Sequence, residues 1–186
     1  PLWWGGRGRM ARGLFQLLGG SGCRILAYDL EPREEVRKMA AYVSLDTIWK
    51  ECDLITFHTP ATEETYHMVN RHTLSQMKDG VVLINMARGS LIDTEALIEG
   101  LEKGRLTGER QKGGAAALDV VENEGSIYYK DFKDCPVGCR EMSVLSAMPN
   151  VLMTPHTAFF TQEAVSDMVE CAMISCARLM AGEKDP

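Results

Sequence analysis

The chain has 186 residues, of which 45% are hydrophobic and 25% are charged, and its formal net charge is -6. These values predict one folded domain with a sizeable core, and they exclude a disordered chain or a coiled coil. The sequence has no cluster of Lys and Arg, which a nucleic-acid partner would need. It has no apolar run near the roughly 20 residues of a membrane helix, and residues 1–10 do not resemble a signal peptide. We therefore expect neither nucleic acid nor membrane as a partner.

The six cysteines do not predict a metal site. Cys135 and Cys139 have Cys-x3-Cys spacing, and Cys171 and Cys176 lie on a predicted helix. Neither spacing is the Cys-x2-Cys pattern of zinc sites. We expect reduced thiols in a cytoplasmic protein.

Short apolar runs alternate with amphipathic stretches, which is typical of βαβ units around a parallel sheet. The predicted strands are Leu2–Gly5, Arg24–Tyr28, Leu54–Phe57, Val81–Asn85, Ala116–Val120 and Val151–Met153, with a very short one at Tyr42–Val43. The predicted helices are Met10–Leu18, Pro32–Ala40, Leu45–Glu51, Arg71–Met77 and Asp93–Lys103, and a final helix with an apolar stripe from Val165 to Met180.

The predicted helix ends and loops depend on a few polar residues and glycines. Asp93 and Thr161 are the expected N-caps, and Gly104 and Gly182 are the expected stops. Thr107–Gly114 and Glu122–Arg140 are interpreted as loops. The second is long for a compact domain, which favours a functional role.

The first motif stands between the first predicted strand and helix. Gly6, Gly8 and Ala11 fit the pattern GxGxxG/A, with Arg9 and Met10 inside it. The glycines permit a tight turn and close approach of a pyrophosphate, and the N-terminus of the following helix favours its negative charge. Asp29 ends the next strand, where a carboxylate can bind the ribose hydroxyls and repel a 2′-phosphate. The glycine motif and Asp29 together predict that the cofactor is NAD rather than NADP.

Three further groups follow later strands, at the edge where ligands bind in open α/β sheets. Arg88 precedes Gly89 and can bind a carboxylate with two parallel hydrogen bonds. Asp119 lies at the carboxyl end of another predicted strand, Glu124 follows that strand, and His156 follows the last one. A carboxylate beside an imidazole stabilises its protonated form, which can give a proton to a carbonyl oxygen. His58, His67 and His72 are interpreted as structural or exposed, although His58 lies near the cofactor side.

The order GRGRMA, ILAYD, DLITFHTP, LINMARGSLIDTEAL, ALDVVENE and NVLMTPHTAF resembles the coenzyme domain of D-isomer-specific 2-hydroxyacid dehydrogenases. The resemblance covers nearly the whole chain, and TPHTAFFTQEAV and ENEGSIYYKDF are similar to the D-lactate dehydrogenase branch. It implies a Rossmann-type doubly wound parallel sheet, NAD as cofactor and a homodimer. We expect residues 1–186 to form one NAD-binding domain that begins inside its first strand and lacks the N-terminal substrate domain.

The resemblance also implies roles for single residues. Arg88 would bind the substrate carboxylate and polarise its carbonyl, His156 would donate the proton, and Glu124 would stabilise the protonated imidazole. The cofactor site would be lined by Gly6, Gly8, Arg9, Met10, Ala11, Asp29, Thr59, Pro60, Thr65, Met86, Ala87, Arg88 and Asp119.

The sequence departs from the family at Thr107–Gly114, which lengthens the connection before the predicted strand that contains Asp119. The leading interpretation is that the protein reduces a small-molecule 2-oxo acid, and the reduction of pyruvate to D-lactate is the reaction we expect most. Three alternatives stay open: another 2-oxo acid reductase such as a hydroxyisocaproate dehydrogenase, an NAD(H)-sensing module similar to the dehydrogenase-like corepressors, or a gene product without function.

Overall fold

The computed structural model describes residues 2–5, 20, 22–106, 114–128, 131 and 139–182, and for residues 2–5, 103–106 and 126 it describes the backbone alone. The chain divides into two compact units, residues 1–155 and residues 156–186. The first unit contains the sheet and its helices. The second contains one long helix, α7 (Gln162–Met180).

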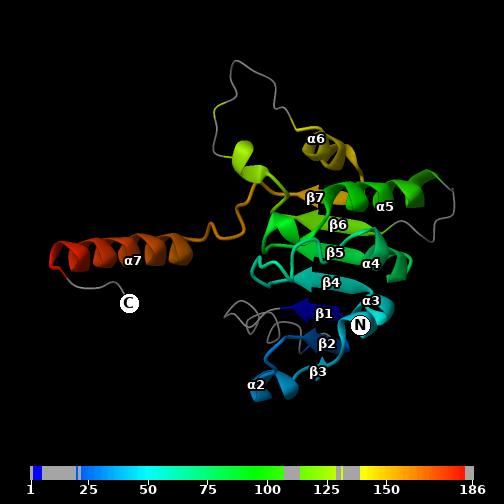
Figure 1. Cartoon of the computed structure of the whole chain (residues 1–186), viewed down its shortest axis with the longest axis horizontal. Coiled ribbons are helices and arrows are strands. Elements are labelled where there is room, and N and C mark those ends of the chain that lie inside the picture. Colours follow the sequence, from blue (N-terminus) through cyan, green and yellow to red (C-terminus); the bar gives the residue numbers. More distant parts are fainter. Residues whose placement is uncertain are drawn as a thin grey trace. The chain divides into compact units, whose positions relative to one another are not determined.

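The first unit is built on a parallel sheet whose seven strands lie in the order β3-β2-β1-β4-β5-β6-β7 (Figure 1). The strands are β1 (Leu2–Gly5), β2 (Ile25–Tyr28), β3 (Ala41–Tyr42), β4 (Leu54–Phe57), β5 (Val82–Asn85), β6 (Ala115–Leu118) and β7 (Val151–Met153). This is the doubly wound Rossmann order with one strand added, and the order reverses between β1 and β4. The predicted α/β fold is confirmed.

Strand β2 is buried on both faces, and this explains why it is a continuous apolar run. In β2, Leu26 lies in one apolar cluster, whereas Ile25 and Ala27 lie in another with Val36. Successive side chains of a strand point to opposite faces, so β2 separates the two clusters. Most predicted strands are correct to within one residue. The exception is β6, which ends at Leu118, so Asp119 follows it directly.

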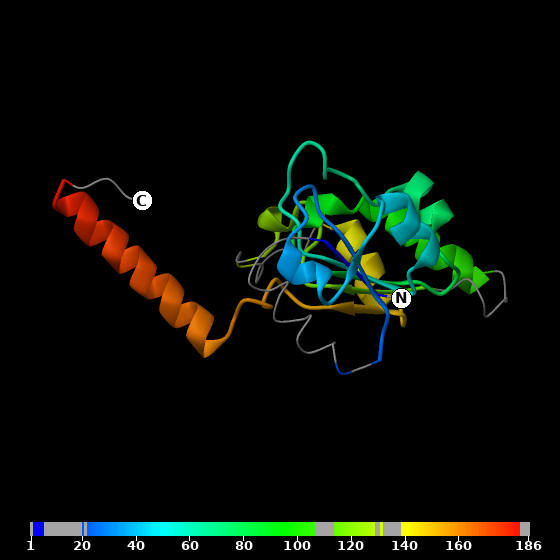
Figure 2. The same ribbon diagram turned by 90° about the horizontal axis from the view of Figure 1, so that it is seen from below.

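The larger cluster joins the sheet to α3 (Leu45–Glu51), α5 (Thr94–Leu106) and α6 (Arg140–Ala147). Leu26, Ile48, Phe57 and Leu145 are completely buried in it. Helices α3, α4 (Arg71–Gln76) and α5 lie on the same side of the strands (Figure 2). The loops between strands and helices are thereby held on a closely packed layer.

Helix ends follow the predicted capping chemistry in most places. The Asp93 carboxylate accepts the N–H of Ala96 at 3.0 Å, and the Thr161 hydroxyl accepts the N–H of Ala164 at 3.1 Å. Gly182 has a φ of 74° directly after α7, which confirms it as the stop. Gly104 is not a stop, because α5 continues to Leu106. A glycine inside a helix costs about 1 kcal/mol, which packing can offset.

Two other predictions need correction or stay untested, and one helix was missed. The helix predicted over Pro32–Ala40 is reduced to α2 (Glu34–Arg37). Helix α6 was not predicted; it is short, and its single completely buried residue, Leu145, gives a weak periodic signal. The predicted helix Met10–Leu18 lies outside the described residues.

Helix α7 carries the apolar stripe predicted for it, and most of its large side chains are exposed, including Val169, Met173 and Leu179. Among the described helices, none combines the length and apolarity that crossing a bilayer requires.

Leu26→Ala should destabilise the first unit by about 2–5 kcal/mol, because it leaves a cavity in a completely buried cluster. The matched control is Leu152→Ala in β7, where the side chain is 66% exposed, and its effect should stay within about 0.5 kcal/mol. Urea unfolding followed by circular dichroism measures both. Equal losses for the two variants would contradict the packing described here.

Candidate active site

The predicted site residues of the first unit gather at one edge of the sheet. Because all strands are parallel, their carboxyl ends lie at the same edge. Asp29 follows β2, His58 follows β4, Met86 follows β5 and Asp119 follows β6. The predicted phosphate turn at Gly6, Gly8, Arg9, Met10 and Ala11 lies outside the described residues. It follows β1, the strand at which the order reverses and where a dinucleotide binds in such sheets.

Asp29 is oriented by its own loop. One carboxylate oxygen, Oδ1, accepts the N–H of Glu31 at 3.0 Å, and the residue is half-buried. This bond directs the carboxylate at the edge of β2, beside central strand β1. Its position and charge fit a group that binds two vicinal ribose hydroxyls.

The loop after β4 contains Thr59, Pro60 and Thr65. The Thr65 hydroxyl donates to the carbonyl of Pro60 at 2.9 Å and accepts the N–H of Thr62 at 2.8 Å. Thr65 therefore shapes a tight turn that follows directly after Thr59 and Pro60 at this edge.

His58 begins the same loop and is poorly suited to donate a proton at neutral pH. Its Nε2 lies 2.9 Å from the Thr56 hydroxyl, and burial lowers its pKa to about 4. An imidazole with this pKa is neutral near pH 7. His58 thus serves as a neutral hydrogen-bonding group.

Arg88 lies in an extended segment that a buried amide supports. Asn85, which is completely buried at the end of β5, donates to the carbonyl of Arg88 at 2.9 Å and accepts the N–H of Ala87 at 3.1 Å. The Arg88 side chain is exposed, and its Nη1 donates to the carbonyl of Ala87 at 2.7 Å. A fixed backbone under an exposed guanidinium suits recognition of a carboxylate. Sequence reasoning missed Asn85; a polar residue closing the run VLIN is the signal that could have found it.

Gly89 lets the loop of Arg88 approach the loop after β6. A Cβ atom at this position would collide with the carbonyl of Val121 and with the backbone N of Glu122. Only glycine, which has no side chain, permits the two backbones to approach this closely. The contact places the Arg88 loop directly against the loop that carries Glu124.

Asp119 and Glu124 are held by hydrogen bonds within the first unit. Asp119 is only 4% exposed, and its Oδ1 accepts the Thr154 hydroxyl at 2.6 Å. The Glu124 carboxylate accepts the N–H of Val121 at 2.9 Å. Asp119 thus links the end of β6 to the segment that precedes His156.

His156 opens the second unit, so its pairing with Glu124 stays a prediction. It has a φ of 51°, in the left-handed region that non-glycine residues rarely occupy. Its ring lies edge-on to Phe159, with centroids 6.1 Å apart. Backbone strain of this kind concentrates at functional sites.

Sequence reasoning also missed the link between His67 and Glu122. The His67 Nε2 lies 2.6 Å from the Glu122 carboxylate, and both side chains are partly buried. Residues 55 positions apart give no sequence signal of such a contact. His72, by contrast, is exposed on α4, as predicted.

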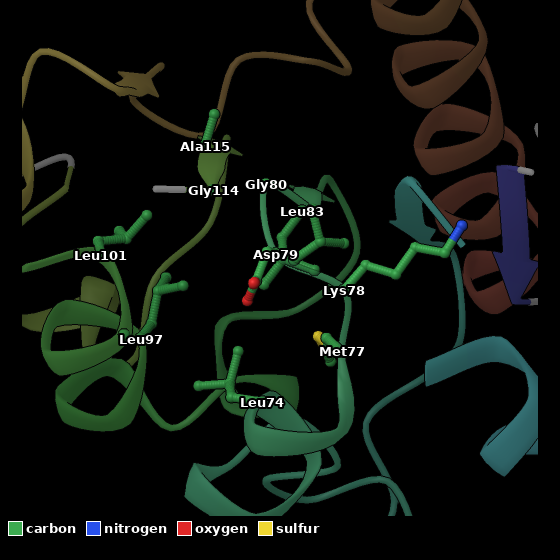
Figure 3. A pocket seen from close by; sticks show the side chains of 12 residues that line it. Leu74, Met77, Lys78, Asp79, Gly80, Leu83, Leu97, Leu101, Gly114 and Ala115 are labelled. Carbon is green, nitrogen blue, oxygen red and sulfur yellow. The ribbon is translucent and has the colours of Figure 1, made fainter. Parts of the chain in front are cut away.

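A small pocket lies at the opposite edge of the sheet, beside the amino ends of β5 and β6 (Figure 3). Leu74, Leu97 and Leu101 form apolar walls, and the Lys78 ammonium turns away to bond Asp53 at 2.9 Å. Because this pocket lies at the amino ends of the strands, it is not part of the site at their carboxyl ends.

Comparison with known proteins identifies the family. The family described as D-isomer specific 2-hydroxyacid dehydrogenase, NAD binding domain, matches residues 5–158. The chain belongs to this family. The match confirms the predicted resemblance and NAD as the cofactor of the domain.

The relatives are about twice as long as this chain. An aromatic 2-oxoacid reductase of Clostridium sporogenes is 39% identical over 171 residues, which are 91% of this chain and 50% of the reductase. A D-lactate dehydrogenase of Lactiplantibacillus plantarum is 40% identical over 171 residues, 91% of this chain and 49% of that enzyme. The crystal structure of D-lactate dehydrogenase with NAD+ from Lactobacillus jensenii gives a TM-score of 0.86 at 36% identity, covering 98% of this chain and 53% of that one.

Gly89→Ala should destabilise the first unit by about 1–3 kcal/mol, because the added methyl group must displace the backbone at Val121. The control is Gly125→Ala, where no atom lies within 4 Å of the added carbon. Thermal unfolding of both variants measures the difference. A Gly89→Ala protein as stable as the control would show that the two loops do not pack closely.

Proposed function

We propose that this chain is the coenzyme domain of an NAD-dependent D-2-hydroxyacid dehydrogenase that reduces a 2-oxo acid, with pyruvate to D-lactate as the leading reaction. The observation that carries the proposal is the exposed side chain of Arg88, whose backbone carbonyl accepts a hydrogen bond from the buried Asn85 amide, at the same edge of the sheet as Asp29. This arrangement provides one group for a carboxylate substrate and one for a ribose. The D-lactate dehydrogenases and the 2-oxoacid reductase among the relatives support it.

The cofactor would lie across the carboxyl ends of β1, β2, β4 and β5. Asp29 binds the adenosine ribose, and the turn at Gly6, Gly8, Arg9, Met10 and Ala11 holds the pyrophosphate. The remaining contacts come from Thr59, Pro60, Thr65, Met86, Ala87, Arg88 and Asp119. Ala87 is 8% exposed and Asp119 4%, so we assign Ala87 to a backbone contact and Asp119 to support through Thr154. When bound, NADH supplies the hydride.

Arg88 binds the substrate carboxylate in this proposal. A guanidinium offers five N–H donors in a planar fork, and two of them match the two oxygens of a carboxylate. The Asn85 amide fixes the backbone of Arg88, so the cost of ordering is reduced to the side chain. The same cation draws electron density from the neighbouring carbonyl and favours its reduction.

His156 donates the proton to the carbonyl oxygen, and Glu124 stabilises its protonated form. His58, which directly follows β4, has a pKa of about 4 and is therefore neutral near pH 7. The left-handed backbone of His156 supports a functional role, because strain is retained where geometry matters.

We further propose a homodimer in the cytoplasm, with residues 1–186 as the NAD-binding domain. The family resemblance supports the dimer, and the thiols of Cys52, Cys139, Cys171 and Cys176 support a reducing compartment. Sedimentation of the purified protein measures the oligomeric state.

The second candidate substrate class is an aromatic 2-oxo acid, which the Clostridium sporogenes relative favours at 39% identity. Comparing kcat/KM for pyruvate and phenylpyruvate separates the two. The protein should be expressed from its complete reading frame, because the chain spans about half the length of its relatives.

Asp29→Ala should weaken NADH binding about tenfold, because a charged acceptor of ribose hydrogen bonds is lost. It should also reduce the ratio by which the protein prefers NADH to NADPH. Glu34→Ala, an exposed acid on α2, is the control and should leave both affinities unchanged. Fluorescence titration with each nucleotide measures the affinities. Unchanged NADH binding in Asp29→Ala would reject the assigned role.

His156→Gln should lower kcat by about 10²–10⁴-fold, because it removes the general acid, while the dissociation constant of NADH should change little. Arg88→Gln should instead raise the KM for the 2-oxo acid by about tenfold or more. His72→Gln, on the exposed side of α4, is the matched control. Steady-state kinetics at varied 2-oxo acid and NADH measure all three. Retained kcat in His156→Gln would mean that the proton comes from another group.

A further inference from the structure

Three loops meet at the side chain of Glu122. One of its oxygens, Oε1, lies 2.6 Å from the Nε2 of His67, in the loop between β4 and α4. The other, Oε2, accepts the N–H of Thr94 at 3.4 Å, at the start of α5 and directly after the Arg88 loop. Glu122 itself belongs to the loop after β6. A single carboxylate therefore contacts all three segments.

The first two loops are also joined by their backbones. The N–H of His67 donates to Ser90 at 2.9 Å, and Val69 forms a parallel bridge with Ile92. The N–H of Asp93 in turn donates to Val69 at 2.9 Å. These bonds make the His67 loop and the Arg88 loop one connected layer, to which Glu122 attaches the third loop.

The third loop carries Glu124 in a tight turn. Asn123 has a φ of 58°, and the Glu124 carboxylate folds back onto the N–H of Val121. Glu122 and Glu124 thus flank one left-handed residue, and a shift of Glu122 moves Glu124 with it. The close contact at Gly89 leaves little space for the turn to move toward Arg88.

The side chain of His67 is itself well fixed. Its backbone φ is 49°, its ring stacks on Tyr66 at 3.9 Å between centroids, and its carbonyl accepts the Asn70 amide at 2.8 Å. The side chains of His67 and Glu122 are 28% and 21% exposed, so solvent weakens their bond less than it would a surface pair. A short bond to a carboxylate from a fixed ring is a strong positional constraint.

We propose that Glu122 and His67 are positioning residues, which hold the Arg88 loop and the Glu124 turn at a fixed separation. This inference rests on the proposed function, because it gives Arg88 and Glu124 their roles toward the substrate. Neither Glu122 nor His67 contacts the substrate in this scheme. They act instead on the positions of Arg88, which binds the substrate carboxylate, and of Glu124, which stabilises the proton donor. Small displacements of such groups lower the rate of reaction strongly.

The test compares three variants of the protein expressed from its complete reading frame. Glu122→Ala should lower kcat/KM for the 2-oxo acid by about tenfold or more, with the NADH dissociation constant within about threefold of the unchanged protein. Glu122→Gln should recover most of the loss, because its amide oxygen still accepts a hydrogen bond. His67→Asn should match Glu122→Ala, since asparagine tolerates the left-handed backbone but is too short to reach Glu122.

The matched control is Glu99→Ala. Glu99 forms an ion pair with Arg71 at 2.6 Å, which joins α4 to α5. Arg71 also lies 4.0 Å from Asp93, but neither Glu99 nor Arg71 takes part in the bonds of Glu122 and His67 described above. This variant should retain kcat/KM. A kcat/KM within about twofold of the unchanged protein in both Glu122→Ala and His67→Asn would overturn the proposal.

Amide hydrogen exchange on the present chain gives a readout that does not need turnover. Glu122→Ala and His67→Asn should accelerate exchange in peptides spanning 86–93 and 119–124, and Glu99→Ala should not. Unchanged exchange in both peptides would overturn the inference. If Arg88→Gln raises the KM for the 2-oxo acid about tenfold or more while the Glu122 and His67 variants keep their kcat/KM, the positioning role alone fails. If Arg88→Gln leaves this KM unchanged, the proposed function fails.

Discussion

Parallel pairing of the strands is the constraint on which the site depends. Each strand of the sheet runs in the same direction as its neighbours, so the segments after β2, β4, β5, β6 and β7 all begin at one edge. The reversal of strand order between β1 and β4 makes the neighbouring loops diverge there. Residues distant in sequence, such as Asp29 and Arg88, are thereby placed at the same edge of the sheet without any direct contact between them.

Buried polar residues of the described part of the chain concentrate at this edge. Thr56 and Asn85 lie at the ends of β4 and β5, Asp119 follows β6, and Thr94 begins α5. Each takes part in a hydrogen bond to a loop segment, as buried polar groups generally must. The exposed groups that would contact the ligand are therefore supported by buried polar groups that would not contact it.

The segments that follow these strands carry unusual backbone conformations. The described non-glycine residues with positive φ are His67, Asn123 and His156, and each follows a strand of the sheet. Placing a bulky residue in the left-handed region costs roughly 1–2 kcal/mol. Surrounding contacts offset this cost for His67 through Glu122, Tyr66 and Asn70. Strain and close packing at Gly89 together indicate that these loops have one preferred arrangement.

The sequence by itself determined the βαβ alternation, the strands, the family and the side of the sheet on which Asp29, Arg88 and Asp119 lie. These features depend on local apolar periodicity and on short motifs, which the order of residues records directly. Helix α6 and the end of α5 escaped prediction, because packing overrides weak local preference at a short helix and at Gly104. Only the tertiary structure decided that Asn85 supports Arg88, that Asp119 binds Thr154, and that His67 meets Glu122. The physical reason is that such bonds join segments which strand pairing and layer packing bring together, and the sequence spacing of the partners carries no trace of that proximity.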